Sequence, residues 1–155
     1  MLFLVFKAGG ADYAVEARKV IEVIPLVTLR ACHNAPAYVA GMANYHETAV
    51  PVMDFGRLLG GMPCAMFLST RIILTSCAAG GDKQRVIGLL AETVTDAVER
   101  EESDFSEDNV AVPGTSCLGK LAINGSGFLQ RITVDRLVSK ELEQMLFANP
   151  EQSPS

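Results

Sequence analysis

The stretch YVAGMANYHETAVPVMDFGRLLG, residues 38–60, predicts a pair of strands closed by a polar tip. A run of small and apolar residues begins at Gly41, the turn falls near His46-Glu47-Thr48, and a second apolar run continues to Phe55. Pro51 lies inside the second run and cannot donate a hydrogen bond to a neighbouring strand. It therefore predicts a sheet edge, a bulge or a strand that faces something other than another strand. We expect this hairpin at the surface, either as a partner-binding surface or as the rim of a barrel.

The rest of the chain is also built from short apolar runs separated by turns. Paired runs with glycine turns between them predict three more hairpins, at residues 2–6 with 11–15, 70–74 with 85–90, and 118–123 with 128–134. Residues 18–24 predict a short helical turn that runs into a strand, residues 26–31 and 93–98 predict further strands, and a helix is expected from about residue 135 to residue 147. This pattern predicts a mainly β fold, either small barrels or a sandwich.

Length and composition favour one acidic globular domain. The chain has 155 residues, of which 49% are apolar and 20% are charged, and its formal net charge is -5. Nucleic-acid binding needs a clustered basic face, whereas the Lys and Arg residues here are scattered singly. We expect one domain over residues 1–148, a flexible tail over residues 149–155, and no nucleic-acid partner.

The sequence predicts a cytoplasmic protein. No basic residue precedes the apolar run at residues 2–6, so this run is not a secretory signal. No stretch approaches the roughly 18 apolar residues that a spanning helix needs, so direct membrane insertion is not expected. The four cysteines form no C-x-x-C pair, which is typical of free thiols in the cytosol; they are Cys32, Cys64, Cys77 and Cys117.

Catalytic and metal-binding patterns are weak. The segment Gly114-Thr115-Ser116-Cys117 lacks the G-x-S-x-G elbow of hydrolases. A thiolate and imidazole metal site would have to come from Cys32, His33, His46 and Cys64, but the adjacent pair Cys32-His33 points to opposite faces if extended. We expect no catalytic residue, no cofactor and no metal. A small β-barrel enzyme or ligand-binding protein is the alternative, and a deep polar pocket would favour it over an interaction module with an apolar groove.

Residues 99–108 form an acidic segment with one arginine, Arg100. The spacing of its carboxylates does not fit an EF-hand loop. Two interpretations stay open, a solvated connection and a docking strip for a basic partner.

The hairpin also carries a family resemblance. In order, Gly41, Asn44, Val50-Pro51-Val52 and Asp54 resemble the signature of the CheW-like adaptor domains of bacterial chemosensory arrays, which usually read G-V-x-N-L-R-G-x-V-V-P-V-x-D-L here. The departures are at the tip, where Tyr45, His46 and Glu47 replace Leu, Arg and Gly, and at Ala91-Glu92, which stand where the family usually has Val-Asp. The resemblance continues over almost the whole chain, from Phe3 to Leu137.

The resemblance implies a specific fold. CheW-like domains consist of two small five-stranded SH3-like barrels packed together across a hydrophobic seam, and we expect a C-terminal helix in addition. We expect the strands of the first barrel over roughly residues 11–66 and those of the second over roughly 67–135, with the N-terminal strands and the helix completing them.

The resemblance also implies a function without chemistry. Members of the family join the cytoplasmic tip of a chemoreceptor to the regulatory domain of a CheA-type histidine kinase, so recruitment to membrane-bound receptor arrays is expected. The altered tip predicts a specialised receptor and kinase pair rather than the generic flagellar set. An excised CheW-like regulatory domain of the kinase itself is a further alternative, against which the strand directly after Met1 and the polar tail favour a free-standing chain.

Seven residues are the candidate partner contacts. Carrying the family's receptor-facing surface onto this chain marks positions on the strand at residues 20–24 and on the signature hairpin. They are Val20, Glu22, Val23, Gly41, Asn44, His46 and Glu47.

Overall fold

The computed structural model describes residues 1–58, 62–78, 84–106, 118–125 and 127–137. These residues form a mainly β fold with a single short α-helix among them, which confirms the predicted fold class. The strands are β1 (Leu2–Ala8), β2 (Ala11–Glu16), β3 (Val20–Pro25), β4 (Val39–Tyr45), β5 (Thr48–Met53), β6 (Arg71–Ala78), β7 (Gln84–Ala91), β8 (Thr93–Glu99), β9 (Phe105–Ser106), β10 (Leu118–Asn124) and β11 (Gly127–Ile132). The helix is α1 (Phe55–Leu58), and three 3-10 turns are η1 (Ala17–Lys19), η2 (Glu102–Asp104) and η3 (Val134–Arg136).

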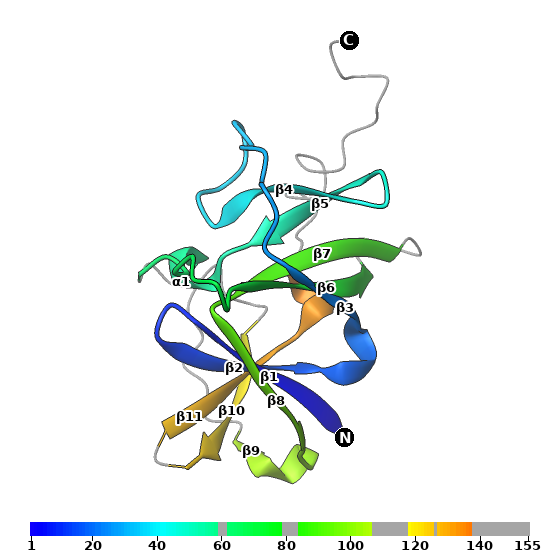
Figure 1. The fold of residues 1–155 in the computed structure, drawn as a ribbon. Coiled ribbons are helices and arrows are strands. Elements are labelled where there is room, and N and C mark those ends of the chain that lie inside the picture. The colour runs from blue at the N-terminus through cyan, green and yellow to red at the C-terminus, as the bar shows by residue number, and fades with distance from the viewer. Residues whose placement is uncertain (59–61, 79–83, 107–117, 126, 138–155) are drawn as a thin grey trace.

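The strands form two sheets that lie one above the other (Figure 1). One sheet has five strands in the order β3-β6-β7-β5-β4, and the other has six in the order β8-β1-β2-β11-β10-β9. The sixth strand, β9, has only two residues. All four predicted hairpins are present, as are the helical turn η1 before β3 and the strand β8, whereas residues 26–31 contribute only an isolated bridge between Arg30 and Met42.

The chain divides between the sheets differently from the expected boundaries at 11–66 and 67–135. Strands β6 and β7 pair with β3 and β5, so the five-stranded sheet holds one continuous segment from β3 to β7. The strands before and after that segment share the six-stranded sheet, because β11 returns to pair in parallel with β2. The division by sequence failed because strand pairing is non-local. The predicted C-terminal helix lies outside the described residues, apart from η3 at its start.

Strands β6 and β7 are buried on both faces. Ile73, Ile87 and Leu89 point into a cluster shared with the six-stranded sheet, where they meet Phe6 and Tyr13. The opposite faces fill a second cluster inside the five-stranded sheet, which contains Val50, Val52, Cys64, Ile72, Leu74 and Leu90. Because each face contacts a separate core, these strands are nearly continuously apolar rather than alternating. The shared cluster is the hydrophobic seam that holds the two sheets together.

The six-stranded sheet curls over a core of its own. Phe3 on β1 contacts Phe105 on β9, with ring centroids 5.2 Å apart, although these strands are not neighbours in the sheet. Ala14, Ala122 and Leu129 complete this third cluster. Each sheet therefore encloses its own core and shares the seam, an arrangement that agrees with two lobes packed together.

Pro51 lies in the inner strand β5, directly before the residues of β5 that pair with β7. It is opposite Met42 on β4, while the parallel pairing of β5 with β7 covers only Val52 and Met53. The missing N–H of Pro51 therefore leaves no gap in the β5–β7 ladder. The structure therefore agrees with one of the predicted alternatives: on the side towards β7, Pro51 does not face another strand.

Two carboxylates organise the connection after the hairpin. Asp54 is buried and accepts hydrogen bonds from the backbone N–H groups of Gly56 (3.0 Å) and Cys64 (3.1 Å). Glu92, which stands where the family usually has Asp, accepts from the N–H groups of Gly9 (2.8 Å) and Ala65 (3.3 Å). The carboxylates thus fix the segment around residues 62–65 against both the hairpin and the β1–β2 turn.

We predict that Asp54→Ala lowers the free energy of unfolding by about 2–4 kcal/mol, because it leaves buried N–H groups without an acceptor and each costs about 1–3 kcal/mol. Urea unfolding followed by circular dichroism measures the change. Asp96→Ala is the matched control, since Asp96 is exposed and accepts a hydrogen bond from the N–H of the adjacent Ala97. Equal stability of the two variants would contradict the assigned role of Asp54.

Candidate functional site

The tip of the β4–β5 hairpin is a two-residue turn in a strained conformation. His46 and Glu47 both have positive φ, 49° and 65°, between the paired residues Tyr45 and Thr48. Two consecutive positive φ values are the signature of a type I′ turn, which favours Asn and Gly. The side chain of Asn44 supports the turn by accepting a hydrogen bond from the N–H of Glu47 (3.0 Å). The β4–β5 hairpin therefore holds two non-glycine residues, both with exposed side chains, in the left-handed region of backbone conformation.

Gly41 lies at the other end of β4 and has a structural reason to be glycine. Its φ is 153°, and an added Cβ would lie 2.8 Å from the carbonyl oxygen of Arg30 and 2.9 Å from Cβ of Leu29. This close approach accompanies the two backbone hydrogen bonds between Arg30 and Met42, each 2.8 Å. The segment between β3 and β4 thereby covers the outer edge of β4.

A hydrogen bond joins the two end strands of the five-stranded sheet. Tyr45 on β4 donates its hydroxyl to the exposed Glu22 carboxylate on β3, with Oη and Oε2 2.6 Å apart. Because β3 and β4 are at opposite ends of the strand order, the sheet must curl until its ends meet. This hydrogen bond to Glu22 raises the pKa of Tyr45, because it favours the protonated phenol that donates it. Glu22 is thus brought beside the tip, as the candidate site requires.

The outward face of β3 and the residues after it expose apolar side chains. Ile21, Val23 and Val27 are 46%, 37% and 39% exposed. Val20, in contrast, is partly buried and packs against the seam. Sequence reasoning marked Val20 and missed Ile21 and Val27, although the odd-numbered alternation of Ile21, Val23 and Val27 was available as a signal.

The seven candidate residues therefore separate into two groups. Glu22, Val23, His46 and Glu47 are exposed and belong to the β3 face or the tip. The positions of Val20, Gly41 and Asn44 are explained by packing, close backbone approach and turn geometry. A partner contact by any of the seven stays a prediction.

A family model described as "CheW-like domain" matches residues 2–142 of the chain. The chain belongs to the CheW-like family. The matched range contains every candidate residue and both sheets.

Two relatives agree with this family, and a solved structure has a similar fold. The chain is 29% identical over 102 residues to the chemotaxis protein CheW of Rhizobium meliloti, a match that covers 66% of this chain and 63% of that protein. It is 24% identical over 141 residues to the chemotaxis protein CheW of Klebsiella aerogenes, covering 90% of this chain and 82% of that protein. The fold is similar to that of the scaffolding protein TtCheW from Thermoanaerobacter tengcongensis, with a TM-score of 0.72 at 20% identity, over 84% of this chain and 82% of the other.

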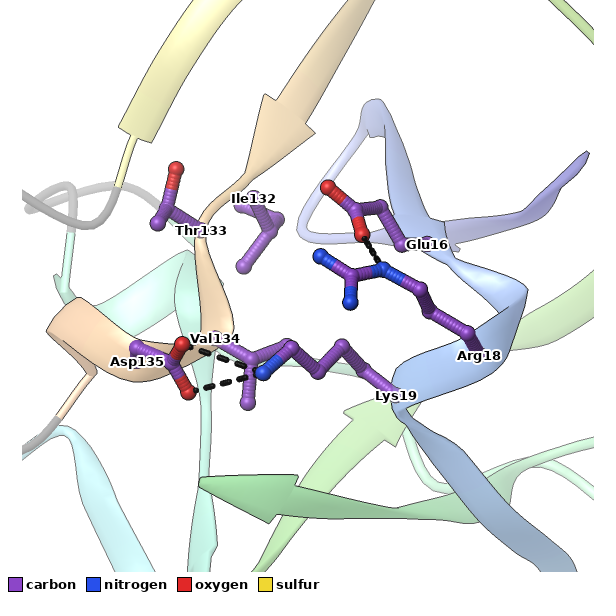
Figure 2. A pocket seen from close by; sticks show the side chains of 7 residues that line it. All are labelled: Glu16, Arg18, Lys19, Ile132, Thr133, Val134 and Asp135. Atoms are coloured by element: carbon purple, nitrogen blue, oxygen red, sulfur yellow. Dashed lines mark hydrogen bonds and ion pairs between the residues drawn. The ribbon is translucent and has the colours of Figure 1, made fainter. Parts of the chain in front are cut away.

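A small pocket lies between η1 and the segment formed by the end of β11 and η3 (Figure 2). Its volume is about 130 Å³. The carboxylate of Glu16 is paired with Arg18, and that of Asp135 with Lys19 at 3.0 Å. The backbone N–H of Ala78 and then Lys19 hold the pKa of Asp135 below its ordinary value. With both carboxylates held as paired anions, neither is poised as a general acid, so this pocket gives little support to the enzyme alternative.

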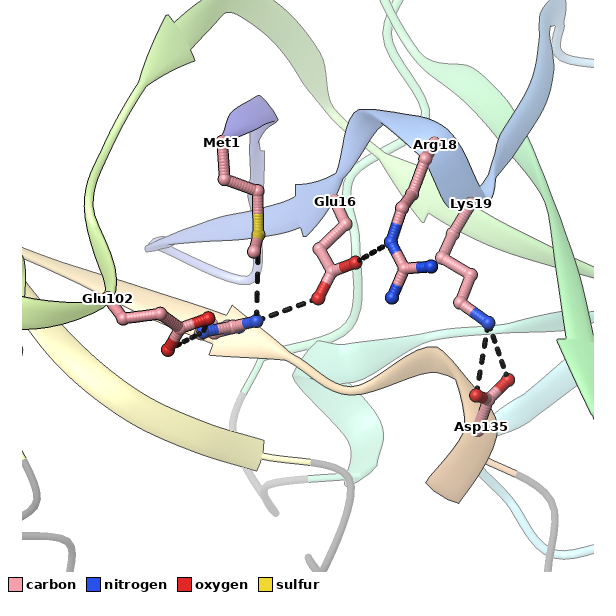
Figure 3. A network of polar contacts seen from close by, with 7 residues as sticks. Met1, Glu16, Arg18, Lys19, Glu102 and Asp135 are labelled. Carbon is pink, nitrogen blue, oxygen red and sulfur yellow. Dashed lines mark hydrogen bonds and ion pairs between the residues drawn. The ribbon is translucent and has the colours of Figure 1, made fainter.

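A larger network joins the strands of the six-stranded sheet (Figure 3). Arg131 on β11 donates to Glu16 at 2.7 Å and to both oxygens of Glu102 at 2.8 and 2.9 Å. Its guanidinium also lies 5.2 Å from the ring centre of Phe3. Burial acts to raise the pKa of Glu16, but the hydrogen bonds from Arg18 and Arg131 outweigh it and leave the pKa below its ordinary value. At least Glu102 of the acidic segment 99–108 is therefore used within the molecule.

The predicted metal candidates do not gather in the part of the chain that the structure describes, where no group of three or more His, Cys, Asp or Glu side chains could hold an ion. Burial, followed by the charges of Asp54 and Glu92, raises the pKa of the Cys64 thiol to about 12. A protonated thiol is a poor ligand and nucleophile. Among the described helices, none is long and apolar enough to cross a membrane.

Segment 62–68 is a second exposed apolar surface. Met62, Met66, Phe67 and Leu68 are 77%, 57%, 59% and 99% exposed. Asp54 and Glu92 hold the backbone of this segment, as described above.

We predict that Glu47→Gly stabilises the protein by about 1 kcal/mol, because glycine adopts positive φ without the steric cost that a side chain incurs. The melting temperature should rise. Thr48→Gly is the matched control on the adjacent strand residue, where glycine should instead lower stability by about 0.5–1 kcal/mol. A fall in melting temperature for both variants would rule out strain at Glu47.

Proposed function

We propose that this protein is a non-enzymatic cytoplasmic scaffold that couples the cytoplasmic tip of a chemoreceptor to the regulatory domain of a CheA-type histidine kinase. The membership of the CheW-like family supports this role, since curated relatives are named chemotaxis proteins. The observation that carries the proposal is strand β3, where Ile21 and Val23 expose apolar side chains and the neighbouring Glu22, on the other face of the strand, reaches the hairpin tip. Exposed apolar residues beside a polar group suit a protein interface.

Such a scaffold acts by holding its partners next to one another. A kinase held beside a receptor experiences a high effective concentration, and receptor states that bind the assembly differently shift the population of active kinase. The scaffold needs binding surfaces that keep their shape, and no reactive group. The seam and the two enclosed cores supply that rigidity.

We predict that Val23→Asp weakens binding to the receptor tip at least about tenfold, because a carboxylate would be buried in an apolar contact without a partner. Isothermal titration calorimetry with a receptor-tip fragment measures the affinity. Val23 is 37% exposed, so the melting temperature should change by no more than about 3 °C.

Ile123→Asp is the matched control, since Ile123 is 74% exposed on the other sheet. It introduces the same chemical change and should leave receptor-tip affinity unaltered. Full affinity in the folded Val23→Asp variant would remove the β3 face from the binding surface. A wild-type protein that bound neither the receptor tip nor the kinase domain would overturn the proposed function.

We further propose that the partners form a specialised set rather than the generic flagellar one. Histidine at position 46 offers at most two donors, fewer than the planar fork of the permanently charged arginine of the usual pattern, and Glu47 adds a negative charge. The double variant His46→Arg/Glu47→Gly should therefore gain affinity for generic flagellar receptor tips and lose affinity for the cognate one. Parallel titrations against both tips measure this, and equal affinity of the wild-type protein for both would contradict the specialisation.

A further inference from the structure

The hydrogen bond between Tyr45 and Glu22 couples the two parts of the proposed binding surface. Glu22 belongs to the end strand β3, whereas Tyr45 directly precedes the turn of the β4–β5 hairpin. Their oxygens are 2.6 Å apart, a short distance that is typical of a hydroxyl donating to a carboxylate. The usual pattern has leucine at the Tyr45 position, and leucine has no group that could make this contact.

The ring of Tyr45 is itself held in place. It packs against the cluster inside the five-stranded sheet. The ring also contacts His46, whose ring centroid is 4.2 Å away in an edge-on arrangement. The hydroxyl therefore projects from an anchored ring, so its position is set by the core rather than by solvent.

We propose that Tyr45 is a positioning residue for partner recognition: its hydroxyl holds the exposed Glu22 carboxylate in one orientation beside the hairpin tip and thereby joins β3 and the tip into a single binding surface. This inference rests on the proposed function. An exposed glutamate otherwise samples several rotamers and loses that freedom on binding, which weakens the complex. A carboxylate already fixed by Tyr45 loses less, and its second oxygen remains available to a donor of the partner.

The test is a double-mutant cycle in the full chain, with Tyr45→Phe, Glu22→Ala and both together, titrated against the receptor-tip fragment and the kinase regulatory domain separately. Tyr45→Phe keeps the ring and removes only the hydroxyl. We expect it to weaken binding of at least one partner about fivefold to tenfold, the effect of losing one hydrogen bond of ordinary strength. In the Glu22→Ala background the same change should have no further effect, because the group that Tyr45 positions is gone.

Thr95→Val is the matched control. It removes a hydroxyl that donates to the carbonyl of Val5 on the six-stranded sheet (3.1 Å), and it should leave both affinities unaltered. Melting curves of all variants separate loss of binding from loss of fold. If Tyr45→Phe were poorly folded, Glu22→Ala still tests the proposal, because it removes the acceptor without disturbing the ring and should weaken the same partner.

Two outcomes would overturn the inference while the proposed function stands. In the first, the wild-type protein binds its partners and Tyr45→Phe binds them equally well. In the second, Tyr45→Phe weakens binding by the same factor with and without Glu22, which would place the hydroxyl in direct contact with the partner. Failure of the wild-type protein to bind either partner would instead overturn the proposed function, and the positioning role with it.

Discussion

The burial of both faces of β6 and β7 is the constraint on which the rest of the structure depends. Ile73 and Leu89 face the seam, and their neighbours Ile72 and Leu90 face the core of the five-stranded sheet. Removing the six-stranded sheet would expose the seam face of these strands to water, at a cost of about 25 cal/mol per Å² of apolar surface. The two lobes are therefore one cooperative unit, and the chain crosses between them before β3 and after β7.

Polar contacts around the seam differ in how much they contribute to the stability of the fold. The ion pairs of Arg131 with Glu102 and of Lys19 with Asp135 are partly open to solvent, where such pairs contribute about 0–1 kcal/mol each. Asp54 is buried and satisfies backbone donors that have no access to water, so its loss costs more. The apolar seam and Asp54 set the architecture, and the surface pairs adjust it.

The proposed binding surface contains two features that cost the folded protein stability. His46 and Glu47 keep positive φ although asparagine and glycine would adopt it at lower cost, and Ile21 and Val23 keep apolar surface exposed. A protein selected for stability alone gains nothing from either feature, whereas an interface requires exposed apolar groups and tolerates strain. Tyr45 connects the two features through Glu22. Under the proposed function, the hairpin tip and β3 therefore act as one surface.

The sequence by itself determined the local elements and the family. Apolar runs separated by turns predicted the four hairpins, because turn chemistry and strand alternation depend only on neighbouring residues. The residues Val50-Pro51-Val52 and Asp54 carried the family resemblance. Only the tertiary structure decided that β6 and β7 join the sheet of the β4–β5 hairpin, that Val20 packs against the seam, and that Glu22 meets Tyr45. The physical reason is that these are pairings between distant segments, which depend on how both sheets curl and which residues fill their cores. Periodicity along one strand carries no information about that choice.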